Sequence, residues 1–239
     1  MEVLNDLVGY KNLKIYQNPE WFRFSLDSVL LPNFVTLRKG IKNIIDLGTG
    51  NLPIPLILTT KTDASITAVE IQKDVYELAK KTLEYNKLEN QITLYNMDML
   101  ELRDKYSQES FDVVLSNPPY FKYLEQSNLN DDLHKTIARH EKCIDLESLI
   151  KLASYLLKNK GVFAVVHRTE RFMEIINLFE KYNIVVKKVQ FVYPKENQES
   201  NLVLVEGVKN GRSGLKVLKP LFVHNEDGSY KDEILKMFE

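Results

Sequence analysis

Cysteine is almost absent from this sequence, since Cys143 is the one cysteine among 239 residues. A single cysteine excludes an intrachain disulfide, and this usage is typical of proteins in a reducing compartment. The four histidines are scattered, so they and Cys143 offer no zinc-ligand spacing. We therefore expect neither a disulfide framework nor a metal site.

Long apolar runs and a strong net charge are missing as well. No run approaches the roughly 20 residues that a membrane-spanning helix needs. The N-terminus lacks the basic and apolar regions of a secretion signal. The formal net charge is −1, so attraction to nucleic acid would depend on a local patch. We expect a soluble, cytoplasmic protein with no membrane contact.

Apolar runs rich in β-branched residues alternate with segments of helical spacing through most of the chain. The runs that predict strands are 43–47, 65–70, 92–95, 111–115, 162–167, 184–192 and 202–205. This alternation favours an α/β fold, with a Rossmann-like, mostly parallel sheet of seven strands and helices on both faces. No helical segment separates the last two runs, so they are expected to form a C-terminal antiparallel hairpin.

No linker-like segment divides the chain, so we expect one domain over residues 1–239. It would comprise a lead-in over 1–35, a Rossmann-like core over 36–208 and a tail over 209–239. Residues 121–144 are polar and without periodicity, and a loop of this length is usually functional, for example as a lid. The helix expected before the 162–167 strand should end near Asn159, with Gly161 in the left-handed position that follows a helix.

The turn Asn117-Pro118-Pro119-Tyr120 follows the apolar run 111–115. Each proline lacks an N–H donor and fixes its own φ, so the strand must stop there. A polar amide and an aromatic ring are thereby held on a rigid turn at the carboxyl end of a strand. Open α/β sheets bind their ligands at that edge. Taken alone, the pattern fits a capped strand end equally well.

A glycine turn follows the first predicted strand, with Asp46, Gly48 and Gly50 in a D-x-G-x-G pattern. The dinucleotide fingerprint G-x-G-x-x-G requires a third glycine where the chain has Pro53, and this disfavours NAD. A carboxylate near a pyrophosphate is also unfavourable, whereas Asp46 suits a cofactor with a cationic centre and no phosphate. S-adenosylmethionine, with its ammonium and sulfonium groups, is such a cofactor.

Two further acids stand at the ends of the next two predicted strands. Glu70 ends the second run, twenty residues after Gly50, where an acid commonly accepts hydrogen bonds from ribose hydroxyls. Asp98 follows the third run, where a side-chain acceptor could meet an adenine amino group. Either acid alone is commonly a helix cap or a surface charge. The ordered series of glycine turn, Glu70, Asp98 and Asn117 turn is harder to explain in that way.

In these four elements the chain resembles the class I S-adenosylmethionine-dependent methyltransferases. Within them it is similar to the N-P-P-Y branch, which methylates amino or amide nitrogens. The resemblance implies that Asp46, Gly48 and Gly50 belong to the cofactor loop. It also implies that Glu70 binds the ribose and that Asp98 contacts the adenine.

The same resemblance assigns methyl transfer to Asn117, Pro118, Pro119 and Tyr120, with Asn117 also bordering the cofactor. The Asn117 side-chain oxygen and the Pro118 carbonyl would accept hydrogen bonds from a planar NH₂ group and aim its nitrogen at the methyl group. Tyr120 would stack on the flipped base, an interaction worth roughly 1–3 kcal/mol. No strong general base is evident in the sequence.

Several substrates carry a nitrogen that suits this turn: adenine N6 in tRNA, rRNA or DNA, and a glutamine side chain of a release factor. Glutamine methyltransferases usually have a helical N-terminal domain, for which the segment before Asp46 leaves no room. Sequence-specific DNA enzymes usually add a target-recognition domain, and none is visible. A non-catalytic nucleotide- or RNA-binding module is the alternative from a different class.

More of the chain resembles one subfamily, the bacterial tRNA(Val) adenine-N6 methyltransferases. The similar segments are residues 22–31 (FRFSLDSVLL), the DLGTGN loop, residues 117–121 and residues 194–198 (PKENQ). This resemblance implies that the partner is a tRNA, methylated at the adenine 3′ of the anticodon.

Basic residues gather late in the chain, on or beside the predicted hairpin. They would form a track for RNA phosphates if they shared a face with the site. Lysines on edge strands also discourage aggregation, so an ordinary solvated surface is the alternative. The residues concerned are Lys187, Lys188, Lys195, Lys209, Arg212, Lys216 and Lys219.

Overall fold

The computed structural model describes residues 2–7, 9–10, 12–18, 26–119 and 145–238. The strands are β1 Val3–Asp6, β2 Lys14–Gln17, β3 Asn43–Leu47, β4 Ser65–Glu70, β5 Ile92–Asn96, β6 Phe111–Ser116, β7 Leu157–Arg168, β8 Ile184–Tyr193, β9 Leu202–Lys209, β10 Lys216–Val217 and β11 Leu221–Phe222. The helices are α1 Asp27–Phe34, α2 Pro53–Thr59, α3 Lys73–Asn86, η1 Met99–Glu101, α4 Leu102–Lys105, α6 Leu146–Leu156, η2 Thr169–Arg171, α7 Phe172–Lys181, α8 Asp232–Leu235 and η3 Lys236–Phe238. None of the helices described here is long and apolar enough to cross a membrane.

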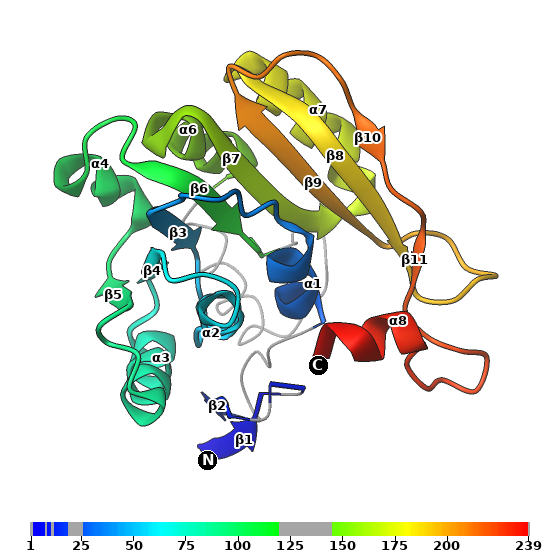
Figure 1. Ribbon diagram of the computed structural model, residues 1–239, viewed down its shortest axis with the longest axis horizontal. Helices are drawn as coiled ribbons and strands as arrows, with labels where there is room; N and C mark the ends of the chain where they lie inside the picture. Colours follow the sequence, from blue (N-terminus) through cyan, green and yellow to red (C-terminus); the bar gives the residue numbers. More distant parts are fainter. Residues whose placement is uncertain (1, 8, 11, 19–25, 120–144, 239) are drawn as a thin grey trace, which may run out of the picture.

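A nine-stranded sheet organises the fold, in the order β10-β8-β9-β7-β6-β3-β4-β5, with β11 also paired to β8 (Figure 1). Strands β3 to β7 pair in parallel, and β9 lies antiparallel between β7 and β8. The predicted Rossmann-like sheet with its C-terminal antiparallel hairpin is therefore confirmed. The expected count of seven strands was wrong, because β10 and β11 also join the edge of β8. Each has two residues, which is too short to show a strand period in the sequence.

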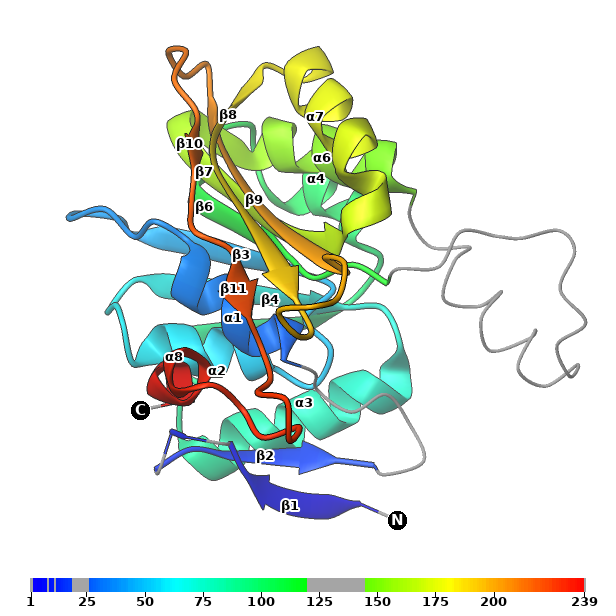
Figure 2. The same cartoon turned by 90° about the vertical axis from the view of Figure 1, so that its right-hand side faces the viewer.

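Helices cover both faces of this sheet, because successive residues of a strand point to opposite sides. In β3, Ile44 packs in one hydrophobic cluster with α1, α2, α3 and α8. Its neighbour Ile45 packs in a second cluster with α4, α6 and α7. Figure 2 shows these two groups of helices on either side of the sheet. Both residues are fully buried, so β3 lies at the centre of the two-sided core.

The junction of α6 and β7 differs from the sequence-based expectation. The helix ends at Leu156, and the chain enters β7 directly. The left-handed residue is Lys160, with φ 65°, in place of Gly161. A Cβ on Gly161 would lie 2.9 Å from the Lys158 carbonyl oxygen and 3.1 Å from that of Asp112. Glycine is needed here for close packing of strands, and not as a helix terminator.

Gly207 in β9 lies close to Ile184 of β8 and to Phe179 of α7. A Cβ at this position would lie 2.5 Å from Ile184 Cγ2 and 2.9 Å from the Phe179 ring. We expect Gly207→Ala to lower the free energy of unfolding by about 1–3 kcal/mol, because a filled core has no room for an added methyl group. Urea denaturation measures this loss. An unchanged midpoint would contradict the close approach of β9 to α7.

Candidate active site

The carboxyl ends of β3, β4 and β6 lie side by side. Leu47 of β3 pairs with Val69 of β4 and with Ser116 of β6. The Ser116 hydroxyl also donates a hydrogen bond of 2.8 Å to the Leu47 carbonyl. Glu70, the last residue of β4, and Asn117, the first residue after β6, therefore flank the glycine turn that follows Leu47. The structure thus brings the predicted cofactor loop and the predicted catalytic turn to one edge of the sheet.

The glycine turn is closed by the carboxylate of Glu70. Gly48 and Gly50 have φ of 75° and 59°, a left-handed conformation that glycine adopts without strain. The Gly50 N–H donates to Glu70 Oε2 at 3.0 Å, and the Gln72 N–H donates to Oε1 at 2.9 Å. A Cβ on Gly50 would meet no atom within 4 Å, so the space beside it is open. Glu70 therefore holds the glycine turn in place. The sequence predicted only a contact of Glu70 with ribose and not this structural role.

Glu70 is held by several donors. Its carboxylate accepts from the backbone N–H groups of Gly50 and Gln72, and the Ile71 backbone and the Gln72 side chain also favour its charged form. Burial raises the pKa of Glu70, and the backbone N–H groups of Gln72 and Gly50 oppose that rise. A ribose hydroxyl would be a further donor to the ionised form.

Asp46 is the most unusual group at this edge. Its side chain is fully buried, and neither carboxylate oxygen has a hydrogen-bond partner within the part of the chain that the structure describes. Burial raises the pKa of Asp46 to about 7; the Thr49 side chain opposes the rise, and the charge of Glu70 adds to it. The neighbouring Thr49 is buried as well. A buried charge is costly unless it is compensated, so Asp46 fits a ligand that brings positive charge or donors.

The remaining predicted residues are placed less completely. Asp98 is half-buried and caps η1, since its Oδ1 accepts a hydrogen bond of 2.8 Å from the Leu100 N–H. Its contact with adenine stays a prediction. Pro118 and Pro119 follow Asn117 in a segment without regular secondary structure. Tyr120 and the predicted loop 121–144 lie outside the described residues.

Two side-chain contacts at this site were not predicted from the sequence: one made by Asn51 and one made by Asn117. Asn51 is buried, and its Nδ2 donates to the Tyr16 carbonyl of β2 at 2.8 Å. Tyr16 in turn donates its N–H to Thr82 of α3. Asn117 Nδ2 donates to the buried Ser28 hydroxyl of α1 at 3.2 Å. The N-terminal segments thus contact both the predicted cofactor loop and the predicted catalytic turn.

Pro53 also has a local explanation. It occupies the first turn of α2, where a missing N–H costs nothing, and Leu52 before it takes a left-handed φ of 78°. The loop therefore enters its helix without the third glycine of the dinucleotide fingerprint.

The Asn51 contact leads to a stability prediction. Asn51→Ala should lower the free energy of unfolding by about 1–3 kcal/mol, because it leaves the Tyr16 carbonyl without its donor. Chemical denaturation measures the change. Asn225→Ala is the matched control, since that amide bonds within the exposed tail. Equal losses in the two variants would contradict a specific role for the loop anchor.

The basic residues of the hairpin do not form one track. Lys188 is directed inward, with Nζ 3.1 Å from the buried Glu206 carboxylate. Lys209 pairs with Ile184 at the start of β8, whereas Lys195 follows the end of β8. A ten-residue strand separates them, so only the Lys195 end lies near the candidate site.

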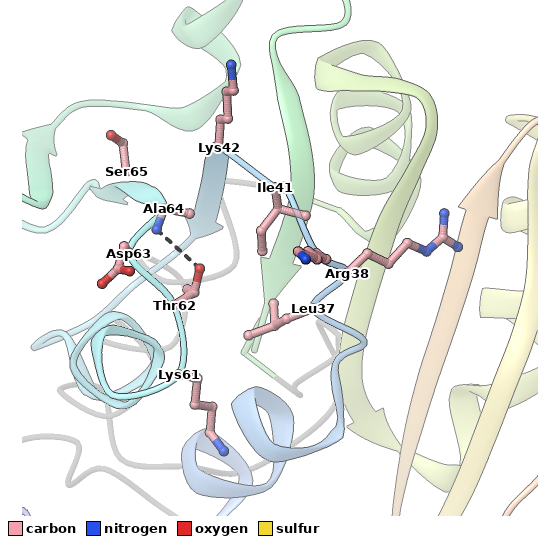
Figure 3. Close-up of a pocket in the computed structure, with 11 residues that line it drawn as sticks. Leu37, Arg38, Ile41, Lys42, Lys61, Thr62, Asp63, Ala64 and Ser65 are labelled. Atoms are coloured by element: carbon pink, nitrogen blue, oxygen red, sulfur yellow. Dashed lines mark hydrogen bonds between the residues drawn. The ribbon is translucent and has the colours of Figure 1, made fainter.

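A separate hollow lies at the opposite edge of the sheet. It has a volume of about 690 Å³ and is lined by residues 37–42 and 61–65, which precede β3 and β4. Figure 3 shows the basic groups of Arg38, Lys42 and Lys61 pointing in different directions. None of the predicted site residues lines this hollow. Nor do the described residues contain a cluster of His, Cys, Asp or Glu suited to a metal ion.

Comparison with known proteins agrees with this fold. A relative from Flavobacterium psychrophilum, named tRNA1(Val) (adenine(37)-N6)-methyltransferase, is 26% identical over 89% of this chain and 91% of its own. A relative of the same name from Bacteroides thetaiotaomicron is 26% identical over 97% of this chain and 89% of its own. The solved structure of a predicted O-methyltransferase from Agrobacterium tumefaciens has the same fold, with a TM-score of 0.70 at 20% identity over 89% of this chain and 95% of that one.

The match to a family model covers most of the chain. The model is described as the methyltransferase small domain, and it matches residues 26–193. That range runs from the start of α1 to the end of β8 and includes the glycine turn, Glu70, Asp98 and Asn117. The chain therefore belongs to the methyltransferase small domain family.

Proposed function

We propose that this protein transfers a methyl group from S-adenosylmethionine to N6 of an adenine in tRNA, the adenine 3′ of the anticodon in tRNA(Val). The observation that carries the proposal is the pairing of Leu47 with Ser116, which sets Asn117 beside the glycine turn. Two relatives that align with most of the chain carry the name of this reaction, which supports the choice of substrate. We propose that residues 1–239 act as one domain in the cytoplasm, where tRNA is modified.

The residues around the glycine turn fit the methyl donor. When bound, S-adenosylmethionine supplies an electrophilic methyl group on a sulfonium. The buried Asp46 carboxylate would hold its cationic amino-acid end, and the open space at Gly50 admits a close approach to the backbone. Glu70 would accept the ribose hydroxyls in charge-assisted hydrogen bonds, which are stronger than neutral ones. Asp98 would accept from the adenine amino group.

Asn117 would orient the nitrogen that receives the methyl group. The exocyclic amine of adenine is planar and a weak nucleophile. Hydrogen bonds from this amine to Asn117 Oδ1 and to the Pro118 carbonyl would retain lone-pair density on nitrogen and aim it at the methyl group. This is catalysis by positioning and electrostatics, with no covalent intermediate. Pro119 would keep the turn rigid, and Tyr120 would stack on the base.

The test compares substrates directly. The protein is incubated with labelled S-adenosylmethionine and with tRNA that lacks the modification, with DNA, or with a release factor. Label in N6-methyladenine of the tRNA is the expected result. Label in DNA or in protein glutamine, with none in RNA, would contradict the proposal. Failure to bind S-adenosylmethionine or S-adenosylhomocysteine in calorimetry would favour a non-catalytic binding module.

A further inference from the structure

The N-terminal strand β2 is held on both of its edges. On one edge it pairs with β1 in an antiparallel ladder. On the other edge, side chains of α3 bond to the strand's backbone. The Lys14 N–H donates to Asn86 Oδ1 at 3.0 Å, and Asn86 Nδ2 donates to the Lys14 carbonyl at 2.7 Å. The Tyr16 N–H donates to Thr82 Oγ1 at 3.0 Å. Helix α3 thus takes the place of a neighbouring strand, and β2 is fixed against it.

The Tyr16 carbonyl connects this strand to the glycine turn. It accepts a hydrogen bond of 2.8 Å from Asn51 Nδ2. Thr82 is fully buried and Asn51 is 8% exposed, so water competes little for either contact. Two hydrogen bonds in series therefore run from Thr82 in α3, through the Tyr16 backbone, to Asn51 in the turn.

The turn around Asn51 has a backbone that needs such support. Gly50 and Leu52, on either side of Asn51, have φ of 59° and 78°. The left-handed conformation is unfavourable for leucine and persists only where the surrounding structure determines it. Glu70 accepts from the Gly50 N–H, and the side chain of Leu52 is fully buried. Asn51 supplies a third attachment, and this one depends on β2.

The supported turn borders the open space at Gly50, where a Cβ would meet no atom within 4 Å. The apparent affinity of a site falls with the fraction of molecules that hold the binding conformation. We propose that Asn51 and Thr82 are positioning residues for S-adenosylmethionine, with Thr82 acting through Tyr16 and Asn51. The proposal rests on the part of the proposed function that places the methyl donor at this turn, and not on the identity of the methyl acceptor. Neither side chain needs to touch the methyl donor.

The first test is calorimetry with S-adenosylmethionine. Asn51→Ala should weaken binding by about 5- to 10-fold, the size of one lost hydrogen bond. Thr82→Val keeps the shape of the side chain but removes the acceptor of the Tyr16 N–H, and it should weaken binding by about 3-fold. Thr82→Ser keeps the hydroxyl and should bind like the wild type. Thr67→Val is the matched control, because this buried threonine of β4 has its hydroxyl 3.4 Å from that of Tyr106, away from β2.

A double-variant comparison separates positioning from general destabilisation. If Thr82 acts through Asn51, then adding Thr82→Val to Asn51→Ala should weaken binding no further. The loss should appear in KM for S-adenosylmethionine and not in kcat, because the catalytic turn is held through β6 and its pairing with β3. A wild-type affinity in Asn51→Ala or in Thr82→Val would overturn the proposal. So would an equal loss in Thr67→Val, or an additive loss in the double variant.

A second readout uses the cofactor-free protein and does not depend on activity. Amide hydrogen exchange measures how often the Gly50 N–H leaves the Glu70 carboxylate. This amide should exchange faster in Thr82→Val, although Thr82 lies in α3, and not in Thr67→Val. If Gly50 exchanges faster and the donor binds more weakly while the wild type methylates no tRNA, the proposed acceptor is wrong and the role of β2 stands. If exchange at Gly50 is unchanged, the positioning proposal fails whatever the acceptor is.

Discussion

Asn117→Ala is expected to reduce methyl transfer to tRNA by about 10²–10³-fold, the usual cost of removing one preorganised polar group from a reacting centre. The reason is geometric. Asn117 follows Ser116, which is paired with Leu47 at the start of the glycine turn, so Asn117 lies beside the place proposed for the methyl donor. No other side chain of the described part of the turn carries a hydrogen-bond acceptor. The cofactor loop is untouched, so affinity for S-adenosylmethionine should change little.

The effect of Asn117→Ala can be interpreted only if the rate of methyl transfer and the affinity for the methyl donor are both measured. Single-turnover kinetics gives the rate of transfer, and calorimetry gives the affinity for the methyl donor. Asn43→Ala is the control, because that asparagine begins β3 at the opposite edge of the sheet and bonds to the Ser110 carbonyl. Transfer at the wild-type rate in Asn117→Ala would contradict the assigned mechanism, and so would a comparable loss in Asn43→Ala.

Asp46→Asn is expected to stabilise the cofactor-free protein above neutral pH while weakening its hold on S-adenosylmethionine. Burial raises the pKa of Asp46 from 3.8 to about 7, so the folded protein holds this proton more tightly than the unfolded chain. The contribution of Asp46 to stability is therefore complete below about pH 4 and is lost as the pH rises to about 7. A shift of this size corresponds to about 4 kcal/mol as an upper bound. Asparagine has no charge to bury, so Asp46→Asn should remove this loss of stability at rising pH.

The same substitution removes the charge proposed to hold the cationic end of the methyl donor. Hydrogen bonds to charged groups contribute about 1.5–3 kcal/mol, so affinity for S-adenosylmethionine should fall by about 10- to 100-fold. Urea denaturation from pH 4 to pH 8 and calorimetry with S-adenosylmethionine measure the two effects. A variant that is destabilised above neutral pH, or that binds the donor as tightly as the wild type, would contradict the account.

Asp112→Asn is a control with the opposite sign. Although partial burial opposes it, the pKa of Asp112 is lowered by Lys158, 2.8 Å away, and by the N–H groups of Lys42 and Asn43. Its contribution to stability is present above the ordinary Asp pKa and is lost as the pH falls. Asp112→Asn should therefore destabilise the protein at neutral pH. If stability changed with pH in the same way in both asparagine variants, the change would not arise from the individual pKa shifts of Asp46 and Asp112.

The sheet and the order of its site residues could be predicted because they depend on local signals. Runs such as 43–47 and 65–70 are buried on both sides, and their apolar composition shows it without any knowledge of partners. Since parallel strands end at the same edge, the residues that follow each run had to meet. The predicted arrangement of the glycine turn, Glu70 and Asn117 follows from that geometry.

What could not be predicted depends on contacts between distant segments. Ser28 and Asn117 are 89 positions apart, and Asn51 and Tyr16 are 35 apart. A buried serine or asparagine has no period in the sequence that would reveal its partner. The two-residue strands β10 and β11 form because β8 offers an open edge, and their own residues carry no strand pattern. The seven basic residues late in the chain likewise could not be assigned to one end of the hairpin or the other before the strand register was known.

The most direct test is to locate the transferred methyl group in tRNA(Val). Unmodified tRNA(Val) is reacted with the protein and isotopically labelled S-adenosylmethionine, cut with a base-specific ribonuclease, and read by mass spectrometry. The account predicts one labelled methyl group, on N6 of the adenine 3′ of the anticodon, and its loss in Asn117→Ala. A methyl group at another atom or position, or unmethylated tRNA from a protein that binds the methyl donor, would contradict it.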